Sequence, residues 1–121
     1  MKKKKVFKTI ATHMLTQKKA SQDRNTCLYR DGYGLSCAIG ILINDDNYSK
    51  ELEGYDITDT RVSTAVANSL GSPPLNAKDR SFLGALQDFH DYSEPQYWRG
   101  ELDIFSMKHF KKDLDDIRVE A

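Results

Sequence analysis

The chain has 121 residues, 39% of them hydrophobic, which supplies one packed core but not two domains of useful size. Its formal net charge is zero, and its longest apolar run, residues 38–43, is far shorter than the roughly 20 residues of a membrane-spanning helix. Polar residues also interrupt the apolar stretch that a signal peptide would need in residues 6–15. We therefore expect a single cytoplasmic domain over residues 1–121 that does not enter a membrane.

The zero net charge hides a gradient along the chain. Residues 1–30 carry nine lysines and arginines against one acidic residue, whereas residues 31–65 carry seven acidic residues against two basic ones. Residues 1–5 are predicted to be a flexible basic arm. A basic amino-terminal helix would suit nucleic acid, but the stretch has little aromatic or glycine character, and an ordinary solvated helix surface is the favoured interpretation.

The first half of the chain is predicted to contain two helical segments and a turn. Apolar residues at spacings of three and four predict an amphipathic helix over residues 6–20, followed by a polar loop at 21–26. Asp31 and Gly32 form a dipeptide typical of a tight hairpin turn between residues 27–30 and 33–37. Residues 36–43 fit either a buried strand or a helix, and a helix capped by Ser36 is favoured.

Three further helices are predicted in the second half. Asp59 or Thr60 caps a helix that ends at Gly71, and Asn76 with Asp79 opens another that runs to about residue 92. A last helix begins at about Asp103, with apolar residues on a common side: Ile104, Met107, Leu114 and Phe110. The predicted fold class is mainly α, within α+β: four or five short helices packed round one small β-hairpin.

Cys37 is the residue best placed for chemistry if a helix begins at Ser36. A helix amino terminus favours the thiolate, and His90, followed by Asp91, would offer a base. The alternative is that Cys37 is a buried apolar residue, and the surrounding run LSCAIGILI favours this alternative. The spacing of Cys27, Cys37 and the three histidines fits no zinc motif, so neither a metal nor another cofactor is predicted.

A binding surface is predicted from polar and aromatic residues. Tyr29, Arg30 and Asp31 lie on the predicted hairpin, and the segment 97–99, which comprises Tyr97, Trp98 and Arg99, is the best single candidate for an exposed anchor. Together with the acidic middle of the chain, these residues would form a contact surface for a basic partner. Cys37, His90 and Asp91 complete the set of candidate binding residues.

The segment CLYRDGYGLSCAIGILINDDNYSKELEG resembles a group of small, largely uncharacterised proteins of bacteriophages and bacteria. The shared pattern is a cysteine, a Tyr-Arg pair, a glycine, and a second cysteine followed by alanine and glycine. The segment LQDFHD is similar to a second block of that group, and the two blocks fall within residues 6–92. The resemblance implies a phage or bacterial origin and a common fold, but it brings no established activity and no catalytic role.

These observations favour a small phage or bacterial accessory protein that binds a host protein, for example as an inhibitor of a host defence system. A cysteine-dependent enzyme or a small-ligand-binding protein with a pocket near Cys37 and His90 is the alternative, although no complete catalytic set is present. Nucleic-acid binding through the basic amino-terminal helix is a further, less favoured alternative.

Overall fold

The computed structural model describes residues 1–23 and 26–119. It contains four α-helices, α1 (Lys3–Gln17), α2 (Thr60–Leu70), α3 (Ala77–Tyr92) and α4 (Trp98–Phe110), and three single turns of 3-10 helix, η1 (Gly40–Leu42), η2 (Lys50–Leu52) and η3 (Pro95–Tyr97). Two strands of only two residues each, β1 (Gln22–Asp23) and β2 (Thr26–Cys27), pair in antiparallel fashion. Among the described residues, no helix has the length and apolar character needed to cross a membrane.

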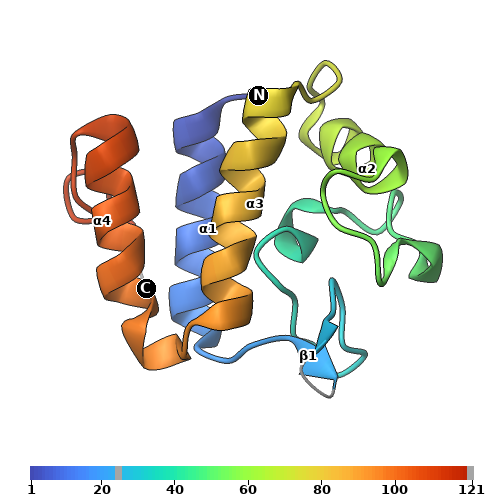
Figure 1. Ribbon diagram of the computed structural model, residues 1–121, viewed down its shortest axis with the longest axis horizontal. Helices are drawn as coiled ribbons and strands as arrows, with labels where there is room; N and C mark the ends of the chain where they lie inside the picture. The colour runs from blue at the N-terminus through green and yellow to red at the C-terminus, as the bar shows by residue number, and fades with distance from the viewer. Residues whose placement is uncertain (24–25, 120–121) are drawn as a thin grey trace.

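Helices α1, α3 and α4 pack against one another. α1 and α3 run in the same direction and α4 runs in the opposite one, while α2 and the loops before it lie on the side away from α4 (Figure 1). The core between the three helices is aromatic and aliphatic: the rings of Phe7 and Phe105 stack with centroids 5.5 Å apart, and Leu83 and Leu86 are fully buried beside them. Each such side chain stabilises the fold by about 1.5–3 kcal/mol through burial.

The predicted ends of the two middle helices are confirmed. Asp59 accepts a hydrogen bond from the amide of Arg61 at the start of α2, and Gly71 ends that helix with φ 65°. Asn76 and Asp79 form a capping box at the start of α3, in which each side chain bonds the other's backbone amide. α1 begins at Lys3, so residues 3–5 of the predicted basic arm belong to the helix.

The predicted β-hairpin around Asp31 and Gly32 is wrong. Between residues 27 and 37 the only ladder contact is a single isolated bridge of Arg30 with Ser36. The backbone amides of Tyr29 and Arg30, which a hairpin would use, donate instead to the carboxylate of Glu53, at 2.8 and 3.1 Å. Asp31 Oδ1 accepts the amides of Tyr33 and Leu35. Side-chain acceptors thus replace the partner strand, and the segment is a loop.

The segments on either side of this loop also differ from expectation. Residues 36–43 contain only the single turn η1, and Ile43 is extended. Ser36 does not cap a helix, because the next helical turn is η1, which begins at Gly40 after Ile39. The Ser36 amide donates to Gln17, and its carbonyl oxygen accepts from His13 and Gln17. The polar segment 21–26, predicted to be a loop, contains β1 and the first residue of β2, and its residues 24 and 25 lie outside the described part of the chain.

The last helix begins earlier than the apolar pattern predicted, and a different face of it packs against the core. α4 starts at Trp98, directly after the turn that Pro95 opens. Trp98, Leu102 and Phe105 are buried, whereas Ile104 and Met107, predicted to face the core, are 72% and 50% exposed. The earlier start extends the apolar repeat back to Trp98, and this repeat sets the buried side.

His13 is expected to make the protein less stable in mild acid. Its Nε2 donates to the Ser36 carbonyl oxygen at 2.8 Å, and burial lowers the pKa of the ring below its ordinary value. The unfolded chain therefore gains a proton near pH 6.5 while the folded chain stays neutral to a lower pH. The free energy of unfolding should fall below pH 6.5, by at most about 1.4 kcal/mol per pH unit from this residue.

Urea unfolding at several pH values between 7.5 and 5.5 measures this effect. The control is His13→Gln, which keeps an amide donor for Ser36 but does not titrate, and it should lose part of the acid sensitivity. An unchanged pH dependence in His13→Gln would contradict the assignment.

Candidate functional site

A cleft of about 830 Å³ along α3 is lined by carboxylate, amide, thiol and hydroxyl side chains. One wall is a stripe of α3 that contains Arg80, Gly84, Asp88 and Asp91, residues whose spacing of three or four places them on one helix face. The other wall is the segment 54–58, and Cys27 and Tyr29 also line the cleft. This volume lies within the usual range for small-ligand sites.

Gln87 organises the inner end of the cleft. Its Oε1 accepts the backbone amide of Ile39 at 3.0 Å, which fixes the orientation of the side-chain amide. Its Nε2 then lies 2.8 Å from Asp91 Oδ1 and 3.1 Å from Cys27 Sγ. One glutamine therefore connects α3, the turn η1 and strand β2.

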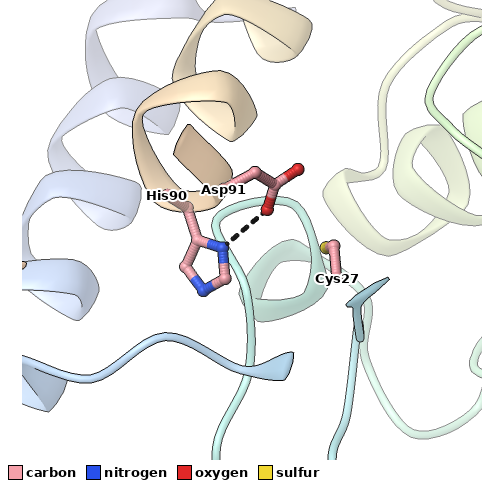
Figure 2. Close-up of side chains that lie close together, drawn as sticks. All are labelled: Cys27, His90 and Asp91. Carbon is pink, nitrogen blue, oxygen red and sulfur yellow. Dashed lines mark hydrogen bonds and ion pairs between the residues drawn. The ribbon is translucent and has the colours of Figure 1, made fainter. Parts of the chain in front are cut away.

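His90 and Asp91 form a pair with a defined protonation pattern. The backbone amide of Ser21 donates to His90 Nε2 at 2.9 Å, so this nitrogen has no proton. The proton of the neutral ring is then on Nδ1, which lies 2.8 Å from Asp91 Oδ1. Figure 2 shows that the other carboxylate oxygen of Asp91 points away from the ring. His90 is buried and stacks on Trp98, whereas Asp91 is partly exposed and lines the cleft.

The two cysteines differ in access but share a protected environment. Cys37 is fully buried, and its Sγ accepts the amide of Gly40 at 3.3 Å. Cys27 is half-buried; the neighbouring Cys37 thiol, burial and the Asp91 carboxylate raise the pKa of its thiol above the ordinary value. A Cys–His nucleophile needs an imidazole lone pair directed at the sulfur. His90 uses its lone pair on Ser21, so the Cys37–His90 pair that the sequence left as an alternative is not assembled.

Cys27, His90 and Asp91 also meet a distance criterion for a metal site. Their ligand atoms lie within 4.8 Å of one another (Figure 2). A metal on His90 Nδ1 would require the ring to carry its proton on Nε2, where the Ser21 amide already donates. The donor set therefore does not fit a metal ion while this hydrogen bond is present.

Slow thiol labelling is the expected consequence of this environment. In the folded protein at pH 7.5, we expect Cys27 and Cys37 to react with iodoacetamide at least about tenfold more slowly than in denaturant, because only the thiolate reacts. Mass spectrometry of the labelled peptides, with Cys27→Ala as the control that leaves Cys37 alone, measures both rates. Labelling of folded Cys27 as fast as that of the unfolded chain would contradict the protected environment.

Tyr29, Arg30 and Asp31 all take structural roles. Tyr29 is 5% exposed and donates its hydroxyl to the carbonyl oxygen of Tyr55. Arg30 pairs with Asp45 at 2.7 Å, donates to the Ile43 carbonyl oxygen and lies over the ring of Tyr48. The prediction that Tyr29 is exposed on a hairpin is therefore wrong. Arg30 remains partly accessible at the surface.

The segment 97–99 is divided between core and surface. Trp98 is fully buried, stacks on His90 and donates its Nε1 to the Ser93 carbonyl oxygen at 3.1 Å. Tyr97 is 58% exposed, and Arg99 is exposed as well. The expectation that Trp98 is an exposed anchor is wrong, because α4 begins at this residue and directs it into the core.

Of the residues that line the cleft, only Tyr29 and Asp91 were candidate site residues from the sequence, and Gln87, Asp88 and Cys27 are among those that sequence reasoning missed. Gln87 and Asp88 lie on the predicted helix 76–92, and their spacing from Asp91 places them on one face with it. That spacing was a usable signal. For Cys27 the sequence contains no such signal, because 60 residues separate it from Gln87 and only the fold brings the two side chains together.

Comparisons with family models, curated proteins and solved structures find no match to this chain. The resemblance to small phage and bacterial proteins therefore stays a prediction.

Proposed function

We propose that this protein acts by binding another molecule, and that the cleft along α3 receives a positively charged group of that ligand. The observation that carries the proposal is the arrangement of Asp91. Its Oδ1 is fixed by His90 and Gln87, which leaves the other oxygen free of both. A carboxylate held in this way at the edge of a cleft is pre-organised for an ammonium or guanidinium group.

The other residues that line the cleft also favour a positively charged ligand. Asp88 and Asp56 add two carboxylates, and among the described residues that line the cleft Arg80 is the only lysine or arginine. Arg80 lies 11 residues from Asp91 on α3, which is about 16 Å along a helix, and donates to the Leu75 carbonyl oxygen. The ring of Tyr92 is 84% exposed and would offer an aromatic face to a cation, whereas one face of the Tyr55 ring is already covered by the guanidinium of Arg61, 4.1 Å from its centroid.

The host protein predicted from the sequence would supply the positive charge through a lysine or arginine side chain, and a free organic amine would supply it through its ammonium group. These two sources share one chemistry. The cysteine-dependent alternative has less support, because Cys37 is buried and the Cys27 thiol is held in its protonated form.

Titration of the ¹⁵N-labelled protein tests the proposal. The probes are N-acetyl-arginine amide, N-acetyl-lysine amide, the amine agmatine, and neutral N-acetyl-glutamine amide, each at millimolar concentration because a single residue binds weakly. We expect the cationic probes to shift the side-chain amide signal of Gln87 and the backbone amide signal of Asp88. Tighter binding of agmatine than of the acetylated residues would indicate a small amine, and the reverse order a protein side chain.

A matched set of variants identifies the carboxylates involved. Asp91→Asn keeps an oxygen for His90 and Gln87 and removes the charge. Within the described part of the chain, the Asp88 side chain makes no hydrogen bond that a change to asparagine would break. Together these two changes should weaken cation binding about tenfold. Asp46→Asn, at an exposed position outside the cleft, is the control. Equal binding of the neutral probe, or equal loss in Asp46→Asn, would overturn the proposal.

A further inference from the structure

A second groove, separate from the cleft along α3, lies between α1 and the loop 34–41 and has a volume of about 1030 Å³. Its two walls are joined by hydrogen bonds: His13 and Gln17 of α1 donate to the carbonyl oxygen of Ser36, and Gln17 also accepts the Ser36 amide at 3.0 Å. Five of its lining residues, Lys5, Lys8, Thr9, Thr12 and Thr16, are spaced so that they form one face of α1. The groove is therefore pre-formed.

The lining of this groove is basic and hydroxyl-rich. Lys5, Lys8 and Lys19 are exposed, three threonines lie between them, and none of the lining residues within 1–23 and 26–119 carries a carboxylate. None of the ion pairs formed within residues 1–23 and 26–119 uses a lysine. The nearest acidic residue along the loop, Asp31, directs one carboxylate oxygen to the amides of Tyr33 and Leu35. No acidic side chain in the described part of the chain forms an ion pair with the lysines of the groove.

The dimensions and the aromatic neighbour of the groove favour one kind of polyanion. Lys5 and Gln17 are 12 residues apart, which corresponds to about 18 Å along α1, the length of a few nucleotides. Tyr33, directly before the lining residue Gly34, is 94% exposed. Single-stranded nucleic acid is bound by positively charged grooves that follow the phosphates, together with aromatic rings on which bases stack.

We propose that this groove binds single-stranded nucleic acid, with the phosphates along Lys5, Lys8 and Lys19 and a base on Tyr33. Phe7, the phenylalanine of the basic stretch, is buried in the core, and the fold supplies an exposed ring, Tyr33, from the loop after β2. This proposal does not depend on the ligand of the cleft along α3.

Fluorescence anisotropy with labelled dT10, rU10 and a ten-base-pair duplex tests it on the full chain. We expect both single strands to bind more tightly than the duplex. With three phosphate contacts, the affinity for single strands should fall about 20-fold between 50 and 200 mM NaCl. DNA and RNA strands share the phosphate and stacking chemistry, and the stronger of the two signals identifies the natural strand.

Two triple variants with the same change in charge locate the site. Lys5→Gln, Lys8→Gln and Lys19→Gln together should weaken binding at least about tenfold and remove most of its salt dependence. Lys78→Gln, Lys108→Gln and Lys112→Gln together, all outside the groove, should change it less than about threefold. Tyr33→Ala should cost about fivefold or more through lost stacking. Equal losses in the two triple variants, tighter binding of duplex, or salt-independent binding would overturn the proposal.

Discussion

Replacing Gly40 with alanine is expected to destabilise the protein by about 3 kcal/mol. A Cβ atom at this position would overlap the carbonyl oxygen of Tyr29 and would lie 2.9 Å from its carbonyl carbon and Cα. All three are backbone atoms, so no rotamer change relieves the overlap. The segment around Tyr29 would have to move away from η1, and the hydrogen bonds of its amides to Glu53 would be strained.

The same displacement should reach the cleft, because Cys27 and Tyr29 both line it. Urea unfolding followed by Trp98 fluorescence gives the free energy of unfolding, since the chain has a single tryptophan. The control is Gly84→Ala in α3, where the new Cβ would lie at an ordinary 3.7 Å from Ile57 Cγ2. That change should stabilise the protein by about 0.5–1 kcal/mol. A loss below 1 kcal/mol in Gly40→Ala would show that the approach of the two segments is not as close as described.

The features predicted correctly from the sequence are those that depend on neighbouring residues. The cap of Asp59 and the capping box of Asn76 with Asp79 involve backbone amides two or three positions away, so the local sequence contains all the information. The C-terminal glycine of α2 is equally local. Helix ends of this kind follow from hydrogen bonding within one turn.

The prediction of a hairpin was wrong because the conformation of residues 27–37 depends on a residue that is distant in the sequence. The dipeptide of Asp31 and Gly32 fits a tight turn, but Glu53, more than 20 positions further on, supplies the acceptors that a partner strand would have provided. No local pattern indicates that choice. The fold class was therefore right in being mainly helical and wrong in its β element.

The candidate site shows the same division between local and long-range information. His90 and Asp91 were recognised, because a histidine and an acid next to each other are visible in any sequence. Their roles were not, because these depend on Ser21 and Cys27, which lie more than 60 positions away. Cys37 attracted attention through its position near an expected helix, and η1 proved too short and too buried to activate it.

Replacing His90 with alanine is expected to cost about 3 kcal/mol in the free energy of unfolding. The ring is 1% exposed and stacks on Trp98 with centroids 5.5 Å apart, so its loss leaves a cavity in the core. The buried amide of Ser21 would also lose its acceptor, and Asp91 would lose one of the two donors that orient it. Urea unfolding measures the loss, and a change of less than 1 kcal/mol would contradict this supporting role.

Two closer replacements separate the hydrogen bonds of His90 from its volume. In His90→Asn the side-chain amide can take the place of Nδ1 and donate to Asp91, whereas in His90→Gln the side-chain oxygen can take the place of Nε2 and accept from Ser21. Each variant should retain part of the stability that His90→Ala loses, and only His90→Asn should preserve the orientation of Asp91. If cation binding in the cleft depends on that orientation, it should survive in His90→Asn better than in His90→Gln.

The ¹⁵N shifts of the His90 ring give the direct readout of its tautomer. Protonated Nδ1 with unprotonated Nε2 is expected, because the Ser21 amide can only donate. This tautomer also prevents His90 from acting as a base for Cys27 and from binding a metal ion through Nδ1. If the ring is instead protonated on Nε2, His90 could act as a base for Cys27 or as a metal ligand. That result would favour metal or thiol chemistry at Cys27 over cation binding by Asp91.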